Sequence, residues 1–374
     1  MFPPLASHIH LEPPRTTSRS FHPLFFRRKK KLKPLTIVGG GLAGLTLGLR
    51  LRQHSVPLTL FEAGTYPRHR VCGEYLSGRA LSVIESLGLR SSLDQLGAVE
   101  SSDVILSRGS SILSRRRLPQ SALCLSRYQF DLFLINQLTS AGATLHTNQR
   151  VSFQPSEGIV HATGRQPSPT EHGWRWFGLK AHARKVSLDA GLEMHLSSRG
   201  YIGLCRIENQ QVNVCGLFRS RHPVSDLAAK WKEWLSGEAN SLLSQRLQNA
   251  QWDDSSFSSI AALSLSPRQA TDRLGVNIGD ALTMIPPVTG NGMSMAIEGA
   301  DLATQPLLEW SHGKISWAVA SRQVAHRLDH AFAKRLRHAR WLQHAMFDPF
   351  AQSLAWNLSR IFPAFPSFLF RLTR

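Results

Sequence analysis

The spacing of hydrophobic positions changes along the chain, and each change predicts a different kind of element. Residues 35–38 form a short β-branched apolar run, which is typical of a buried strand, and residues 45–53 continue with helical spacing. A second apolar run at residues 58–61 predicts another strand. Four short runs between residues 174 and 216 alternate apolar and polar positions, which predicts successive antiparallel strands. The chain is therefore predicted to be α/β, with two kinds of sheet.

The two ends of the chain differ from its body. Residues 1–34 contain six prolines and a basic run at residues 27–31, and they show neither helical nor strand periodicity. We expect a disordered basic leader, which is either a targeting segment, a solvated extension or sequence upstream of the true start. Residues 311–374 are predicted to be mostly helical, with aromatic residues between basic ones. This composition suits contact with a membrane surface, and the alternative is helices packed on the fold with solvated charges.

Composition and charge narrow the classes of function. The chain has 374 residues, of which 42% are hydrophobic, and no apolar run is long enough to span a membrane. Lys and Arg number 44 against 25 Asp and Glu, but eight basic residues lie in residues 1–34 and nine in residues 321–374. The body is only mildly basic, so we expect no nucleic-acid partner. Four cysteines without CxxC spacing predict no disulfide framework, no metal site and a cytoplasmic location.

A glycine motif joins the first predicted strand to the first predicted helix. Gly39, Gly41 and Gly44 form GxGxxG, and with Leu42 and Ala43 between them they are the predicted cofactor-binding residues of this turn. Gly39 permits the tight turn, Gly41 lets the backbone approach a pyrophosphate, and Gly44 lets the helix pack closely on the strand. The helix N-terminus then presents free N–H groups to the phosphates.

Glu62 supplies the second half of this pattern. It ends the strand at residues 58–61 and follows Gly41 by 21 residues, where dinucleotide-binding folds place the carboxylate that binds the adenosine ribose. The alternative, a glycine-rich turn without a ligand, would leave Glu62 at a strand end without a purpose. The motif, its strand–turn–helix context and the acid together predict dinucleotide binding.

A second pattern lies far downstream. Residues 275–281 form an apolar strand that ends in Gly279 and Asp280, and residues 285–293 form a loop rich in proline and glycine before a helix. On these residues the chain resembles flavoproteins of the para-hydroxybenzoate hydroxylase type, which implies an FAD-binding Rossmann-like domain with an inserted antiparallel-sheet substrate domain and C-terminal helices. The resemblance implies that Asp280 binds the ribityl chain of FAD. It also implies that the flavin pyrimidine edge lies on the loop of Gly290, Asn291, Gly292 and Met293.

Arg127 extends the match within the cofactor domain. Residues 125–132 resemble the RxxFDxxL helix start of these enzymes, in which the arginine reaches the FAD pyrophosphate, and a guanidinium suits that contact. The alternative for Arg127 is a plain surface cation. Residues 159–165 resemble the strand ending in Ala-Thr-Gly that returns the chain to the cofactor domain.

Residues 66–77 carry the resemblance to one branch of the superfamily. They resemble the PRxKxCGGxLS segment of the geranylgeranyl reductase group, with Arg70 in place of the lysine and Glu74 in place of a glycine. In that group the segment runs along the flavin, so the resemblance places Arg70 and Cys72 at the cofactor. The sequence lacks a YxWxFP motif, which leaves reduction of prenyl chains open.

The predicted antiparallel strands supply the candidates for chemistry. We expect Lys180, His182, Glu193 and His195 to face the substrate cavity, and a histidine is the natural proton donor near neutral pH. His182, His195 and Cys72 are therefore the candidate catalytic residues. The alternatives are ordinary sheet positions for the histidines and a small flavin-packing residue for the cysteine.

These observations predict a two-domain FAD-dependent oxidoreductase, monooxygenase-like or reductase-like, that acts on a lipophilic or aromatic small molecule. NAD(P)H or a protein electron donor would be the reductant. The alternative is a flavin-loaded binding or peripheral membrane protein without turnover, and the intact flavin loop favours the enzyme. The predicted boundaries are 35–100, 121–165 and 266–310 for the FAD-binding domain, 101–120 and 166–265 for the substrate domain, and 311–374 for the C-terminal helices.

Overall fold

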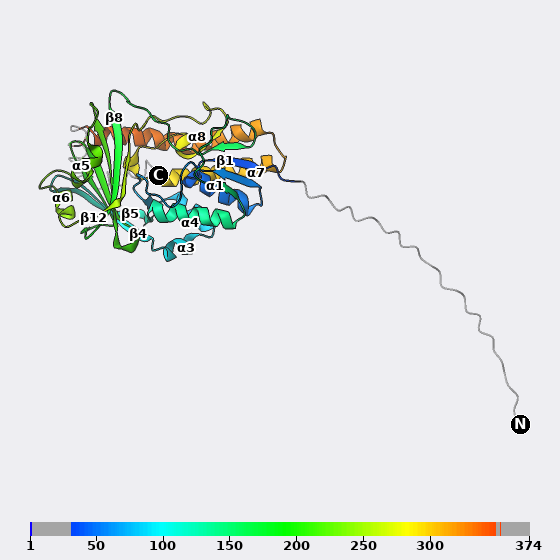
Figure 1. The fold of residues 1–374 in the computed structure, drawn as a ribbon, viewed down its shortest axis with the longest axis horizontal. Coiled ribbons are helices and arrows are strands. Elements are labelled where there is room, and N and C mark those ends of the chain that lie inside the picture. Colours follow the sequence, from blue (N-terminus) through cyan, green and yellow to red (C-terminus); the bar gives the residue numbers. More distant parts are fainter. Residues whose placement is uncertain (2–30, 349–351, 353–374) are drawn as a thin grey trace. The chain divides into compact units, whose positions relative to one another are not determined.

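The computed structural model describes Met1, residues 31–348 and Gln352, and nearly all of the predicted basic leader lies outside these residues. The chain divides into a unit of residues 1–31 and a unit of residues 32–374. The described part of the second unit contains a parallel sheet, a larger and mostly antiparallel sheet, and helices that include two at its C-terminal end (Figure 1). The predicted α/β fold is confirmed.

The parallel sheet has five strands, and its centre is the first strand of the fold. Its order is β13 (Val276–Asn277), β7 (Ile159–His161), β1 (Leu35–Val38), β2 (Leu58–Phe61) and β6 (Thr144–His146). All its pairings are parallel. The carboxyl ends of these strands meet at one edge, which brings Gly39, Glu62 and Gly279 to the same edge because each follows a strand end.

The first four helices of the fold contribute to the hydrophobic core of this half. They are α1 (Leu42–Gln53), α2 (Arg79–Ser86), α3 (Arg90–Gln95) and α4 (Arg127–Ser140). Leu45 of α1, Ile84 of α2 and Leu134 of α4 are fully buried in the same cluster as Ile37 of β1. Burial of these apolar side chains holds the helices against the sheet.

The second sheet has eight strands. Its order is β12 (Gln251–Ile260), β8 (Arg175–Arg184), β11 (Val212–Ser220), β10 (Gly200–Arg206), β9 (Leu192–Leu196), β4 (Val99–Arg108), β5 (Ser111–Cys124) and β3 (Tyr75–Leu76). Only β4 and β9 pair in parallel. The short helices η1 (Glu208–Gln210), α5 (Leu227–Ser236) and α6 (Leu242–Leu247) follow its strands.

Alternation of side chains gives this sheet two different faces. Ala181 pairs with Val214, and both pack in a cluster with Trp231 of α5 and Leu243 of α6. The neighbouring residues therefore point to the opposite face, because successive side chains of a strand alternate. That opposite face carries Lys180 and His182, so it is the face that matters for chemistry.

The C-terminal part of the described chain consists of η2 (Gly279–Ala281), η3 (Pro287–Thr289), α7 (Gly292–Ser311) and α8 (Trp317–Met346). Along α8 the buried positions recur every four residues, from Ala320 and Val324 to Leu328, and this stripe joins the core of the parallel-sheet half. Among the described residues, no helix has the length and apolar character needed to cross a membrane.

Candidate cofactor and substrate site

The glycine turn after β1 leaves an open space beside one of its three glycines. Gly39 has a φ of 112°, and a Cβ there would lie 2.1 Å from the carbonyl oxygen of Ala162. A Cβ on Gly44 would lie 2.0 Å from the carbonyl oxygen of Gly39, whereas a Cβ on Gly41 would meet no atom within 4 Å. Packing therefore requires glycine at Gly39 and Gly44, and the space beside Gly41 can receive a ligand.

The N-terminus of α1 opens onto the same space. Gly41 is its N-cap in an extended conformation, and no side chain caps the first turn, which begins with Leu42 and Ala43. The first N–H groups of a helix have no partner within the helix and carry the positive end of its dipole. This end of α1 therefore suits a pyrophosphate, as the sequence predicts.

Glu62 holds the turn in place as an anion. Its carboxylate accepts hydrogen bonds from the amides of Gly40 and Gly64, both at 2.8 Å, and pairs with Arg68 at 2.6 Å. Burial alone would raise the pKa of Glu62, but Arg68 and the two amide hydrogen bonds outweigh it and lower that pKa. An ionised carboxylate at this strand end suits the hydroxyl groups of a ribose.

Asp280 and three arginines surround a second part of the site. The side chain of Asp280 is exposed, yet desolvation by the surrounding protein raises its pKa to about 6, against the charges of Arg127, Arg165 and Arg70. The carboxyl group of Asp280 is therefore accessible to a ligand and yet partly desolvated by the protein around it. This is the environment that a ribityl chain with its hydroxyl groups would fill.

Arg127 is fixed at the start of α4. Ser126 caps the helix by accepting a hydrogen bond from the amide of Gln129 at 3.1 Å. The guanidinium of Arg127 then donates two hydrogen bonds of 2.7 Å to Asp131, and the Nε of Arg70 lies 3.4 Å from the same carboxylate. Arg127 is therefore a mostly buried and oriented cation, which differs from the alternative of a plain surface residue.

The predicted flavin loop contacts the segment at residues 66–77, although the two are far apart in sequence. The hydroxyl of Ser294 in α7 donates to the carbonyl oxygen of Ser77 at 2.7 Å, and the amide of Ser77 donates back to this hydroxyl at 3.2 Å. Gly290 has a φ of 62°, and a Cβ there would lie 3.5 Å from the ring of Tyr75.

The start of α7 has the open geometry seen at α1. Asn291 is the N-cap of α7, no side-chain cap covers the first turn, and a Cβ on Gly292 would meet no atom within 4 Å. Met293, the next residue, is buried in the core. A ligand that carries negative charge is stabilised at such a helix terminus.

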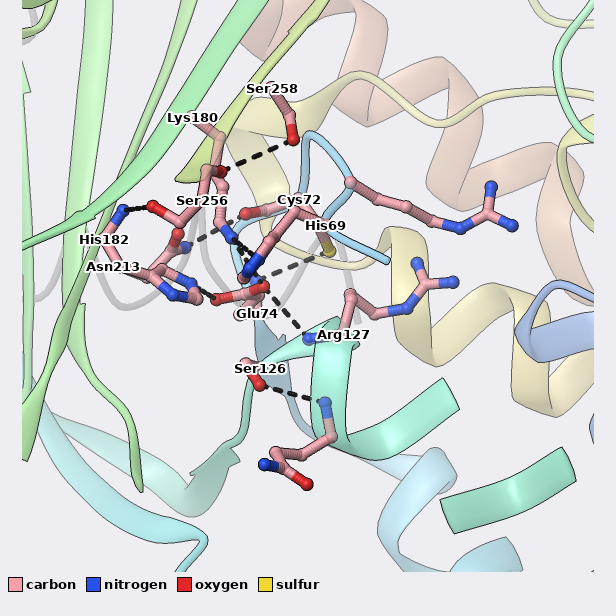
Figure 2. Close-up of polar contacts among 12 residues, drawn as sticks. His69, Cys72, Glu74, Ser126, Arg127, Lys180, His182, Asn213, Ser256 and Ser258 are labelled. Carbon is pink, nitrogen blue, oxygen red and sulfur yellow. Dashed lines mark hydrogen bonds and ion pairs between the residues drawn. The ribbon is translucent and has the colours of Figure 1, made fainter. Parts of the chain in front are cut away.

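A buried cluster of charged groups joins this segment to the antiparallel sheet (Figure 2). The carboxylate of Glu74 lies 3.2 Å from Nζ of Lys180 and 2.7 Å from Nε2 of His182, and all three side chains are buried. The amide of Arg127 donates to the same carboxylate at 3.0 Å. Burial would raise the pKa of Glu74, but the hydrogen bond from His182 and the charge of Lys180 lower it.

The backbone of Glu74 has a conformation that is unfavourable for residues other than glycine. Its φ is 54°, in the left-handed region that favours glycine. The motif that residues 66–77 resemble has a glycine at this place, and here a glutamate occupies it. The cost of the conformation is offset by contacts that only a carboxylate can make with Lys180 and His182.

His69 completes the cluster as a neutral acceptor. Its Nδ1 lies 3.3 Å from Nζ of Lys180, and its ring stacks on Tyr128 with centroids 4.5 Å apart. Burial, together with the charges of Lys180 and His182, lowers the pKa of His69 to about 4. At neutral pH the imidazole therefore accepts a hydrogen bond from the Lys180 ammonium group.

The lowered pKa of His69 predicts a dependence of stability on pH. Between pH 6.5 and about 4 the unfolded chain binds a proton at His69 that the folded chain does not, so the free energy of unfolding falls as pH falls through this window. We expect His69→Gln to reduce this dependence when urea denaturation is followed at several pH values. His54→Gln, at an exposed histidine, is the control. An unchanged pH dependence in His69→Gln would rule out the proposed environment.

Cys72 lies beside the cluster as a neutral thiol. Its carbonyl oxygen accepts a hydrogen bond from Nδ2 of Asn213 at 3.0 Å, and its sulfur accepts one from the amide of Glu74 at 3.4 Å. Burial raises the pKa of Cys72, although the nearby Arg127 acts in the opposite sense. The thiol form suits packing against a cofactor better than nucleophilic attack.

The structure separates the two candidate histidines. His195 lies on β9, three strands from β8 in the sheet order, which is about 14 Å. Its register partner is Ile202, which packs with Leu179 on the opposite face of the sheet. There Nδ1 of His195 lies 2.7 Å from the hydroxyl of Ser107, and Nε2 lies 3.2 Å from Glu193.

The expectation that Lys180, His182, Glu193 and His195 all face one cavity therefore needs correction. Glu193 pairs with Leu204, and Leu204 packs in the same cluster as Ala181. Glu193 therefore lies on the face of Ala181, opposite to the face of Lys180. The register in which neighbouring strands pair determines which face of the sheet each side chain occupies, because a shift of one residue moves it to the other face. Conversely, the sequence did not predict Glu74 and His69 as site residues. The signal for Glu74 was its charge at a position where the motif has a glycine.

Comparisons with known proteins agree with this geometry. Residues 33–173 match a family described as FAD binding domain. The fold is similar to that of the flavin-dependent brominase Bmp2, with a TM-score of 0.69 and 17% identity over 91% of this chain and 92% of that one. It is also similar to pqsL, a probable FAD-dependent monooxygenase from Pseudomonas aeruginosa, with a TM-score of 0.65 and 15% identity over 85% and 97% of the two chains.

A third similar structure is a flavoprotein/dehydrogenase from Cytophaga hutchinsonii, with a TM-score of 0.66 and 14% identity over 84% of this chain and 86% of that one. No curated protein matches the sequence. The chain therefore carries an FAD-binding domain, as the sequence predicts, and its fold is similar to that of these flavin-dependent proteins. The open helix termini, Glu62 and the accessible Asp280 all fit FAD.

Proposed function

We propose that the protein is an FAD-dependent monooxygenase that acts on a lipophilic or aromatic small molecule. The observation that carries this proposal is the buried cluster of Glu74, Lys180 and His182, which lies where the segment at residues 66–77 meets the antiparallel sheet. Buried charged groups that pair with one another beside a cofactor-binding segment are typical of catalytic sites.

The face of the sheet that carries this cluster also supplies an apolar wall. Tyr201 and Leu217 are register partners on this face, and both pack in one cluster with Trp176 and with Val288 of η3. Alternation places Trp176 on the same face as Lys180, because the two residues are four positions apart on β8. A mostly apolar, aromatic lining with a few fixed polar groups is typical of small-molecule sites.

FAD bound here would supply the redox chemistry, by taking electrons from a reductant and passing them to oxygen. The chain's own residues would orient the substrate and handle its protons. Glu74 holds His182 by its Nε2, which fixes the ring, and neutral His69 accepts from the Lys180 ammonium group. These groups could stabilise an oxyanion on the substrate or hold a proton there. NAD(P)H or a protein electron donor is the reductant in this proposal.

A reductase of the geranylgeranyl reductase kind is the second candidate. It is favoured by the hydrogen bonds between Ser77 and Ser294 and by the ring of Tyr75 beside Gly290, which place the reductase-like segment next to the predicted flavin loop and the start of α7. In this alternative the same site would deliver electrons to a substrate double bond instead of to oxygen.

Turnover of the holoprotein distinguishes these functions. A monooxygenase gives substrate-dependent oxygen uptake with NAD(P)H or another reductant, and one atom of labelled oxygen appears in the product. A reductase gives a product heavier by two hydrogens without oxygen uptake. Neither activity, across a panel of phenols, aromatic acids and isoprenoids and with several reductants, would contradict the proposed enzyme.

The two histidines provide a matched pair of variants for this assay. We expect His182→Gln to lower turnover by about 10²-fold with unchanged FAD content, because His182 would handle a proton of the substrate. His195→Gln should leave turnover within about twofold, because His195 lies on the other face of the sheet. Equal losses in both variants would contradict this placement of the substrate site.

A further inference from the structure

Helix α8 has a strongly basic outer face. While its inner face is buried in the core, its exposed side chains include five arginine or lysine residues and three histidines. They are Arg322, His326, Arg327, His330, Lys334, Arg337, Arg340 and His344. Arg322 and Arg340 are 18 residues apart, so the basic face extends for about 27 Å along the helix.

Within the described chain this face has little negative charge beside it, apart from Glu171, which acts on His344 near the C-terminal end. The helix contains one acidic residue, Asp329, and its carboxylate accepts hydrogen bonds from the amides of Ala270 and Thr271. Arg335 of α8 pairs with Glu298 at 2.6 Å, whereas the five exposed arginine and lysine residues form no ion pair with a described residue. The five exposed basic residues therefore repel one another, which is a cost that an anionic partner would remove.

The C-terminal end of this face is apolar as well as basic. Trp341 is 57% exposed, directly after Arg340. The chain beyond Gln352 contains Trp356 and four phenylalanines together with three arginines, and it contains no acidic residue. An acidic protein or a nucleic acid would pair with the charges, but a lipid bilayer offers both anionic headgroups and an apolar interior for the aromatic side chains.

We propose that the outer face of α8, together with Trp341, docks on a membrane that contains anionic lipids. The C-terminal end of α8 packs on the apolar wall of the sheet: the ring of its C-cap residue, Phe347, lies edge-on to Trp176 at 4.9 Å and 5.8 Å from Tyr201. Docking would therefore bring the substrate wall close to the lipid, which suits a lipophilic substrate. This consequence rests on the proposed function, whereas the docking itself does not.

Vesicle binding tests the proposal with the full-length holoprotein. We expect co-sedimentation with vesicles of phosphatidylcholine and phosphatidylglycerol, little with phosphatidylcholine alone, and release by high salt. A variant with glutamine at Arg322, Arg327, Lys334, Arg337 and Arg340 should bind the anionic vesicles at least about 50-fold more weakly. Its FAD content and melting temperature should match those of the wild type, because these side chains lie outside the core.

A matched variant controls for net charge. It places glutamine at five exposed basic residues elsewhere, Arg108, Arg117, Arg150, Arg206 and Lys230. This variant should keep vesicle binding within about threefold of the wild type. Equal loss in both variants, full binding of the α8 variant, or no wild-type binding to anionic vesicles would overturn the proposal. Binding to an acidic protein or to nucleic acid through α8 without vesicle binding would also overturn it.

Discussion

Replacing Glu74 by glutamine is expected to lower the free energy of unfolding by about 3–5 kcal/mol. The substitution keeps the shape of the side chain but removes the negative charge that pairs with Lys180 at 3.2 Å and receives a hydrogen bond from His182 at 2.7 Å. Lys180 would then remain buried without its anionic partner, and burial of an unpaired charge is costly. Urea denaturation of the variant and the wild type measures the difference.

Two further variants separate charge from backbone conformation. Glycine is the residue that a φ of 54° favours, by about 1–2 kcal/mol, so Glu74→Gly gains backbone freedom and loses the carboxylate. We expect it to remain less stable than the wild type. In the double variant Glu74→Gln/Lys180→Met, most of the lost stability should return, because no unpaired charge is left. A Glu74→Gly variant more stable than the wild type would contradict the role given to this cluster.

Replacing Gly41 by valine is expected to weaken FAD binding at least 100-fold while leaving the apoprotein folded, which corresponds to about 2.7 kcal/mol. A Cβ at Gly41 meets no protein atom within 4 Å, and its φ of −82° is open to any residue. The new side chain would therefore occupy the space of the ligand and not that of the protein. Titration of the apoprotein with FAD, followed by flavin fluorescence, measures the loss.

Gly44→Ala is the matched variant for this experiment. Its Cβ would lie 2.0 Å from the carbonyl oxygen of Gly39, so we expect a lower melting temperature of the apoprotein itself. Gly41→Val should keep the melting temperature of the apoprotein close to that of the wild type. Wild-type affinity for FAD in Gly41→Val would show that the pyrophosphate does not lie at this turn.

The cofactor half of the site could be predicted from the sequence because its signals are local. The turn at Gly39 and Gly41 follows a strand and starts a helix, and Glu62 ends the next strand, so adjacent parallel strands bring the glycine turn and the acid together. Asp280 follows the strand β13 at the same edge of the sheet. Each of these relations depends on short stretches of chain.

The substrate half depends on pairings that the sequence does not reveal. His182 and His195 both occupy polar positions in strands that alternate apolar and polar residues. The register of pairing through β11 and β10 nevertheless places them on opposite faces of the sheet. The partnership of Glu74 with Lys180 joins residues more than a hundred positions apart, and only the folded sheet brings them together. The motif shows that Glu74 is unusual at its position, but it does not predict that Lys180 and His182 are its partners.

The identity and amount of the bound cofactor test the central claim of a flavin-dependent enzyme most directly. The protein is denatured, and the released cofactor is identified by mass spectrometry and quantified by absorbance. We expect FAD at close to one per chain, since Glu62 suits an adenosine ribose and Asp280 a ribityl chain. Release of FMN or a nicotinamide nucleotide instead, or failure of the apoprotein to take up added FAD, would contradict it.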